Sequence, residues 1–493
     1  MLKRLLRFLV PPRRKEDKIL KNENRNEGKR KENQEVHFFR PIIGDGYVRF
    51  SWNGKALDRL FREGRRNVTF TYHRNASLNI EMAYNQLMCL FFPLMHGAIE
   101  GKIYVSFQDT VDKKAAENWI LLRNSNSIVL SDDCLGKNLW PKQTTPGAGI
   151  ALLYGGGKDS LGALSIYSNV YLNEEISLLR VHWSKQSVTR HREIFNSQVI
   201  TKLGKKFKFR YLDCSSTFHQ NLVHRKYAHH VGLSFYHSCM LPYYDKYNFS
   251  IVNYSYDALE FHTSPSIGYL SLRPETARTT DSILKNIGIY SKIRNISFGI
   301  PSFLHYDIVK RIDKNNLSLI YMCEDTHSKW CYNCRKCFTF GLLGLESGIE
   351  SKLIDFSYSS LFGTEGYVET AIMPLIKNLD RGYSSKLAYA AQYSSFQHVL
   401  SNIDPLELKK KGIIDESSEK TLSELCLLQS KPAPLTRKFW SAAMQFEAVD
   451  DSEELIRFMK KLGLAECDHK VIKLDINAES EYEIPSSVNH SFS

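Results

Sequence analysis

The chain has 493 residues, of which 43% are hydrophobic and 12% aromatic, so it is long enough for two or three globular domains. It has no run of about 18–20 uncharged apolar residues, which argues against a transmembrane helix. The formal net charge is +13, and residues 1–34, with twelve Lys or Arg and five Asp or Glu, hold more than half of it.

Residues 1–35 are predicted to form a basic flexible tail. The tail is either a solvated extension or a short amphipathic anchor for an anionic membrane or nucleic acid. Residues 1–10 mix basic with apolar residues and precede Pro11 and Pro12, a pattern unlike a secretory signal. Six of the ten cysteines are scattered, several of them in apolar runs, which predicts reduced thiols and a cytoplasmic protein.

Residues 36–145 are predicted to form an α+β domain without an evident chemical signature. Strands are expected at 36–39, 47–52, 67–72 and 102–107, and helices at 78–96 and 115–123. The helix at 78–96 includes the most apolar run of the chain, which is too short to cross a membrane. A linker rich in Pro and Gly then leads to residue 150.

Residues 147–345 alternate between strand and helix patterns. Strands are expected at 150–154, 176–183, 208–214, 249–254 and 294–298, and helices at 159–168, 191–203, 231–241 and 279–287. This alternation predicts an α/β fold, a doubly wound parallel sheet with helices on both faces. Ligands of such sheets bind beyond the carboxyl ends of the strands.

A glycine-rich turn follows the first of these strands. Three glycines allow positive φ and a close approach of backbone N–H groups to an anion, and the next helix adds its positive end. The sequence thus predicts a phosphate site, although a turn that merely joins strand to helix remains the simpler alternative. Kinase-type loops place Ser or Thr directly after Lys, whereas here an Asp intervenes. The candidate residues are Gly155, Gly156, Gly157, Lys158, Asp159 and Ser160.

Four cysteines cluster just before an apolar, helix-like run at 338–345. The predicted metal ligands are Cys323, Cys331, Cys334 and Cys337. Two residues between ligands let one backbone knuckle present two sulfurs, and four thiolates predict a structural zinc ion without an open coordination position. An iron–sulfur cluster is the main alternative. His327 lies within the same segment and is a less favoured ligand.

Residues 346–474 are predicted to form a mostly helical C-terminal region, with helices at 406–411 and 454–462. Residues 475–493 are polar and predicted to be a flexible tail.

The glycine turn resembles the PP-loop of the ATP pyrophosphatase superfamily, written SGGxDS, with Gly155 in place of the first Ser. The resemblance implies an adenine nucleotide alpha hydrolase-like (HUP-like) fold and cleavage of ATP between its α and β phosphates. It implies that Gly155 to Gly157 and Ser160 cradle the phosphates and that Lys158 offsets charge on the β-phosphate side. It further implies that Asp159 orients the loop or helps to hold Mg²⁺.

The glycine turn, the doubly wound sheet and the four-cysteine knuckle near its end together resemble the 7-cyano-7-deazaguanine synthase family (QueC). The long preceding domain and the Trp330–Cys337 run are more similar to the UDP-N-acetylmuramoyl-L-alanyl-L-glutamate epimerase family, MurL. That resemblance implies adenylation of a small-molecule carboxylate, with epimerisation of a terminal glutamate. Asn253-Tyr254 departs from the Asn-Glu pair expected there. Two alternatives remain open: a QueC-like or related nucleobase-conjugating enzyme, including those of antiphage defence, and a non-catalytic ATP-binding scaffold.

Overall fold

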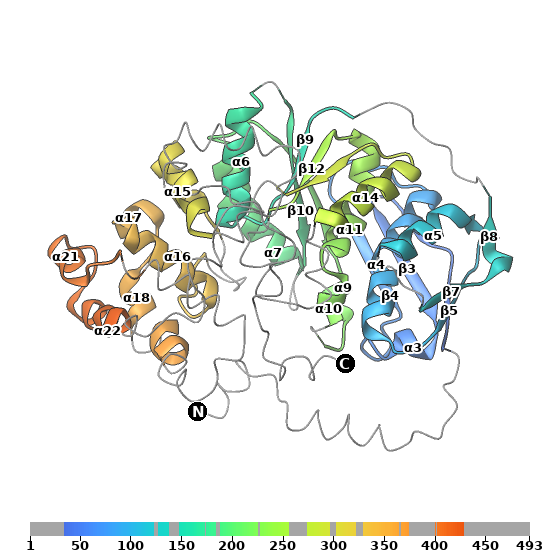
Figure 1. Cartoon of the computed structure of the whole chain (residues 1–493), viewed down its shortest axis with the longest axis horizontal. Coiled ribbons are helices and arrows are strands. Elements are labelled where there is room, and N and C mark those ends of the chain that lie inside the picture. The colour runs from blue at the N-terminus through green and yellow to red at the C-terminus, as the bar shows by residue number, and fades with distance from the viewer. Residues whose placement is uncertain are drawn as a thin grey trace, which may run out of the picture.

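The computed structural model describes residues 34–122, 127–137, 147–172, 174–183, 188–224, 227–255, 274–295, 302–321, 329–363, 366–373, 400 and 402–427. In these residues the chain forms an α/β fold around one large, mostly parallel sheet of eleven strands (Figure 1). The strand order is β13-β12-β9-β10-β11-β4-β3-β1-β5-β7, with β2 paired to β3. Residues 1–33 of the predicted tail 1–35, the predicted tail 475–493 and the predicted helix at 454–462 lie outside the described residues. Residues 34 and 35 of the predicted tail instead begin a strand, because they pair with the strand that starts at Ile103.

One half of the sheet is entirely parallel. Its strands are β9 (Ile150–Leu153), β10 (Ile176–His182), β11 (Arg210–Ser216), β12 (Ile251–Asn253) and β13 (Lys292–Arg294). β9 lies in the middle, between β10 and β12, so the chain first builds outward on one side of β9 and then on the other. This reversal of strand order beside β9 is the place where open α/β sheets bind ligands.

Helices cover both faces of this half. α6 (Lys158–Val170), α7 (Val188–Phe195) and α15 (Ser302–Ile312) pack on one face, and α11 (Leu233–Tyr247) and α14 (Pro274–Asn286) pack on the other (Figure 1). β9 and β10 are accordingly buried along most of their length, as strands covered on both sides must be.

The other half of the sheet has mixed directions and is covered on one face. Its strands are β1 (Gln34–Phe38), β2 (Ile42–Gly44), β3 (Tyr47–Asn53), β4 (Asn67–Tyr72), β5 (Ile103–Phe107) and β7 (Ile128–Leu130). Buried and more exposed residues alternate along β3, because α4 (Ile80–Ala98) and α5 (Lys113–Leu121) cover only one side. A separate two-stranded pair joins β6 (Val111–Asp112) and β8 (Leu135–Gly136).

The two halves meet where β4 pairs antiparallel with β11, in the register Cys214 with Tyr72 and Ser215 with Thr71. One hydrophobic core, core 1, therefore runs from β1 through α4 and α11 to β13 without interruption. A second, core 2, lies on the α6 face and extends into the C-terminal helices. The division into domains at 36–145 and 147–345 stays a prediction. Both predicted domains contribute strands to the same sheet.

α4 is a core helix, as predicted. Asn79 caps it by accepting a hydrogen bond from the Met82 N–H at 2.8 Å, and the helix is buried from Met82 to Met95. Its buried Gln86 is anchored inside the core, where the side-chain amide donates to the Ser238 carbonyl of α11 at 2.8 Å. Among the described residues, no helix has the length and apolar character needed to span a bilayer.

The C-terminal part is helical where it is described. Its α-helices are α16 (Arg335–Glu346), α17 (Ser351–Ile354), α18 (Tyr358–Phe362), α21 (Pro405–Lys410) and α22 (Glu416–Leu427). They extend core 2 on the side of α6 and α15, away from the N-terminal strands (Figure 1). The predicted helices at 338–345 and 406–411 are confirmed within a few residues.

Candidate functional site

The glycine turn leaves the carboxyl end of β9 and enters α6. Gly156 has φ +85°, a backbone conformation that residues with a Cβ rarely adopt. A Cβ at Gly156 would also lie 2.9 Å from the Phe195 ring and 3.0 Å from the Tyr321 carbonyl oxygen. The Gly156 carbonyl in turn accepts a hydrogen bond from the Tyr321 N–H at 2.7 Å. The turn is therefore clamped on both sides, and only glycine fits its centre.

The other two glycines have different roles. Gly157 is the N-cap of α6 and offers no side chain to the first N–H groups of that helix, which are the groups available to an anion. Gly155 has room for a Cβ, whose nearest neighbours would be Arg180 Nη1 at 3.8 Å and Ser160 Oγ at 3.9 Å. The Ser160 hydroxyl donates to the Gly157 carbonyl at 3.1 Å and so stays inside the turn.

Lys158 and Asp159 form an ion pair at the start of α6. Lys158 Nζ lies 2.5 Å from Asp159 Oδ1, and the lysine side chain is only 4% exposed, so it points inward. His305 of α15 is fully buried behind the pair, with Nε2 at 3.9 Å from the same Oδ1. Gly162 permits this approach, since a Cβ there would lie 2.8 Å from His305 Nδ1. The pairing uses one of the two oxygens of Asp159.

Arg180 of β10 brings a positive charge to the turn. Its Nη1 donates to the carbonyls of Gly155 at 3.0 Å and Tyr154 at 3.3 Å. The guanidinium lies over the Phe195 ring, with Cζ at 4.2 Å from the ring centroid. Burial lowers the pKa of Arg180, yet a guanidinium stays charged near neutral pH. Among the described residues, no carboxylate forms an ion pair with it.

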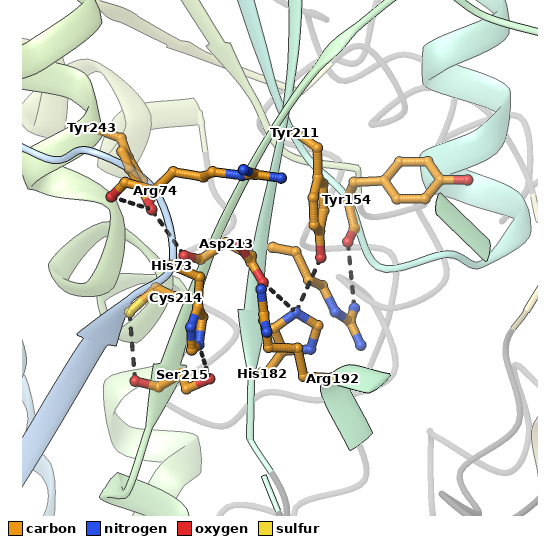
Figure 2. A network of polar contacts seen from close by, with 11 residues as sticks. His73, Arg74, Tyr154, His182, Arg192, Tyr211, Asp213, Cys214, Ser215 and Tyr243 are labelled. Carbon is orange, nitrogen blue, oxygen red and sulfur yellow. Dashed lines mark hydrogen bonds and ion pairs between the residues drawn. The ribbon is translucent and has the colours of Figure 1, made fainter. Parts of the chain in front are cut away.

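A polar network lies beside Arg180 on strands β10 and β11 (Figure 2). Asp213 and His182 are both fully buried, and Arg192 of α7 donates from Nε to Asp213 Oδ2 at 2.5 Å. His182 Nε2 lies 3.0 Å from the Tyr211 hydroxyl and 3.4 Å from Asp213 Oδ2. Burial lowers the pKa of His182 to about 4, so the imidazole is neutral at pH 7. Burial would raise the pKa of Asp213, but hydrogen bonds from His182 and Arg192 outweigh it and keep the carboxylate ionised.

On the other side of β9, Asn253 ends β12 and is fully buried. Its Oδ1 accepts from the Tyr167 hydroxyl of α6 at 3.4 Å, and its amide donates to Ser255 Oγ at 3.2 Å. The Asn253-Tyr254 pair therefore packs into the sheet and helps to fix α6 against β12.

Three of the four predicted metal ligands come together. The sulfurs of Cys331, Cys334 and Cys337 all lie within 4.8 Å of one another, a group able to hold a metal ion. Cys334 caps α16 by accepting from the Cys337 N–H at 3.5 Å, so the helix start itself forms the knuckle. Cys323 and His327 lie outside the described residues. Of the scattered cysteines, Cys89 and Cys239 are fully buried and form no disulfide in the described part of the chain.

The turn residues were predicted from the sequence, whereas Arg180, Phe195 and His305 were not. These three are far from the turn in sequence and reach it only through strand pairing and helix packing. A charged residue inside the mostly apolar strand Ile176–His182 was the one available signal for Arg180. Comparison with protein-family models, curated proteins and solved structures finds no significant match to this chain.

Proposed function

We propose that the protein is an ATP-dependent enzyme that forms AMP and diphosphate by adenylating a small-molecule carboxylate. The proposal combines the PP-loop resemblance with one structural observation: the Gly155–Ser160 turn lies at the reversal of strand order beside β9, with Arg180 next to it. In the reaction, a carboxylate oxygen of the acceptor attacks the α-phosphorus. The bond from that phosphorus to the bridging oxygen breaks, and pyrophosphate leaves.

The residues of the turn support this reaction in separate ways. The N–H groups of Gly157 and the first turn of α6 bind phosphate oxygens, and Arg180 offsets negative charge on them. Lys158 is buried and paired with Asp159, so its positive charge acts on the bound phosphates from inside the protein. Asp159 has a second oxygen for Mg²⁺, which would offset the charge of the triphosphate.

For the cysteine cluster we propose a structural Zn²⁺. Zinc bound tetrahedrally by sulfur at about 2.3 Å places two sulfurs about 3.8 Å apart. The Cys331 and Cys337 sulfurs lie 3.9 Å apart, which fits that geometry. Cys323 is the proposed fourth ligand, and the metal holds the start of α16 in place rather than taking part in chemistry.

Pyrophosphate release over a panel of carboxylates tests the function. UDP-N-acetylmuramoyl-L-alanyl-L-glutamate is the first proposed acceptor, with glutamate inversion read by chiral analysis, and carboxydeazaguanine represents the QueC-like alternative. Stimulated release of pyrophosphate with AMP as the other product supports adenylation. Formation of ADP and phosphate, or ATP binding without any release, contradicts it, and the latter favours a scaffold.

Asp159→Asn keeps the size of the side chain but weakens both the pairing with Lys158 and the proposed Mg²⁺ contact. We expect pyrophosphate release to fall at least about a hundredfold, because charge stabilisation in such sites is worth several kcal/mol. Circular dichroism checks that the fold is kept. Turnover within twofold of the parent would exclude the role assigned to Asp159.

A further inference from the structure

Three arginines from three different elements lie around the network beside the glycine turn. Arg180 belongs to β10. Arg192 belongs to α7, and Arg74 follows β4, the strand that pairs with β11; Figure 2 shows both. Asp213 contacts two of these regions. Its carboxylate accepts a hydrogen bond from Arg192, and its backbone carbonyl accepts one at 3.2 Å from the N–H of His73, the residue before Arg74. Arg180 and Asp213 are direct partners in the β10–β11 ladder.

The positive charges around Asp213 outnumber the negative ones. Among the described residues, Asp213 is the only carboxylate in ion-pair contact with any of the three arginines. His182 is neutral, and burial keeps the Tyr211 hydroxyl protonated by raising its pKa. Three guanidinium groups therefore face a single carboxylate, an excess of about two positive charges. The charges of Arg180, Arg192 and Arg74 all act to lower the pKa of Tyr211, so all three lie within electrostatic range of its hydroxyl.

The hydrogen-bonding capacity of these arginines is only partly used. Arg180 Nε is buried without a hydrogen-bond partner in the described part of the chain. Arg192 donates to Asp213 through Nε alone, and no described residue accepts a hydrogen bond from its Nη groups. Its side chain is 30% exposed and Arg74 is exposed, so a ligand can reach both from solvent. The buried guanidinium of Arg180 favours an anionic partner nearby, and an anion held there can also reach the unused Nη groups of Arg192.

The three arginines differ in their separation from the turn. Strands lie about 4.8 Å apart, so Arg180 is one strand from β9, whereas Arg74 follows a strand three places away, about 14 Å from it. A triphosphate bound at the turn meets Arg180 first. Arg192 and Arg74 remain for a different anionic group.

We propose that Arg192 and Arg74, with Arg180 at the edge nearest the turn, bind an anionic group of the acceptor. The inference rests on the proposed adenylation. It specifies the acceptor class: a carboxylate that carries a further phosphate or carboxylate besides the one activated. A nucleotide-linked peptide has such groups, whereas a neutral ring with one carboxylate has none left after adenylation.

Titration of the full chain with inorganic pyrophosphate tests this in the presence of saturating α,β-methylene-ATP, whose α–β bond cannot be cleaved. We expect pyrophosphate to bind this complex and its affinity to fall about tenfold in Arg74→Gln and in Arg192→Lys, the loss expected for one charged hydrogen bond. Binding of the ATP analogue should change less than twofold. A parallel titration with glutarate shows whether the site accepts carboxylate as well as phosphate.

Arg49→Gln is the matched control. Arg49 is an exposed arginine on β3, near the Tyr47 ring and outside the network, so the variant should bind pyrophosphate like the parent. Arg74 is exposed and Arg192→Lys keeps the positive charge, so both variants should fold. Full competition between pyrophosphate and the ATP analogue, or equal affinity in all variants, overturns the inference. Pyrophosphate binding without any binding of the ATP analogue instead overturns the proposed adenylation and leaves the anion site standing.

Discussion

Gly155 and Gly156 are neighbours with opposite steric constraints. Gly156 combines positive φ with contacts of 2.9 Å and 3.0 Å from a Cβ to its surroundings, whereas a Cβ at Gly155 meets only ordinary contacts. The sequence alone predicted both as parts of one phosphate turn. It could not separate them, because the atoms that crowd Gly156 belong to Phe195 and Tyr321.

Gly156→Ala should destabilise the protein by about 2 kcal/mol, since the left-handed backbone alone costs a residue with a Cβ about 1–2 kcal/mol. We also expect binding of an ATP analogue to be lost, because the turn must move away from Tyr321. Urea unfolding and calorimetry measure the two effects. Gly155→Ala and Gly155→Ser are the paired controls, expected within about 0.5 kcal/mol of the parent. Equal effects at the two positions would refute this assignment.

His237 of α11 is a buried imidazole in core 1, with Nδ1 at 3.0 Å from the Tyr244 hydroxyl. Burial lowers its pKa to about 3, whereas the unfolded chain takes up a proton near pH 6.5. Its contribution to stability is therefore present above pH 6.5 and is lost as the pH falls through that value towards 3.

We expect His237→Gln to lose about 1–2 kcal/mol less stability than the parent between pH 7 and pH 5. Urea midpoints at the two pH values give the comparison. Glu81, whose pKa burial raises to about 7, acts in the opposite direction, but it is present in both proteins and cancels. Parallel pH profiles for the parent and the variant would show that His237 takes up its proton in the folded state.

At the scale of elements, the cysteine knuckle and the glycine turn are close in the chain, because Tyr321, which contacts the turn, is ten residues before Cys331. The Tyr321 N–H donates to the Gly156 carbonyl, and Tyr321 directly precedes the segment that contains Cys323. Trp330, which directly precedes Cys331, stacks on Phe340 of α16 with ring centroids 4.3 Å apart. A metal that ties Cys323 to the knuckle would therefore also hold Tyr321 against the turn.

Removal of the metal should weaken binding of α,β-methylene-ATP about tenfold or more, because the support of Gly156 is lost together with the knuckle. Binding by the dialysed and the zinc-reloaded protein measures the effect, with circular dichroism to detect unfolding. Cys426→Ser, a cysteine outside the cluster, is the control and should keep its metal. Unchanged affinity in a protein shown to be free of metal would refute the connection.

Most of the strongly patterned elements followed from the sequence. The strand Asn67–Tyr72 begins and ends where it was predicted, and the helix expected at 159–168 begins one residue earlier and ends two later. β6, β7 and β8 were not predicted, since they have two or three residues each and too little periodicity. The strand expected at 294–298 begins earlier, at Lys292, and residues 296–298 lie outside the described part.

At the scale of the whole molecule, the sequence predicted the parallel half of the sheet and its ligand edge but not the pairing of β4 with β11. That contact joins residues more than 140 positions apart, and no local pattern encodes it. The same non-local pairing places Arg74 beside the network, which is why the arginine group was not visible in the sequence.

A chain starting at residue 147 should be insoluble. It would expose the edge of β11, and it would uncover α11, which packs against α4 in core 1. Soluble yield and urea unfolding compare this fragment with the full chain. A soluble fragment with one cooperative transition would show instead that the predicted unit 147–345 folds without its N-terminal partner.

The β4–β11 ladder also limits how the protein can close around its substrates. Rotating one half against the other would tear backbone hydrogen bonds out of the centre of a continuous sheet. Hinge motion between the halves is thus disfavoured. For the proposed reaction, we expect ATP and its acceptor to be brought together by smaller shifts, such as a movement of α7. Arg192 lies on α7 and donates a hydrogen bond to Asp213 of β11, so a shift of α7 would change this contact directly.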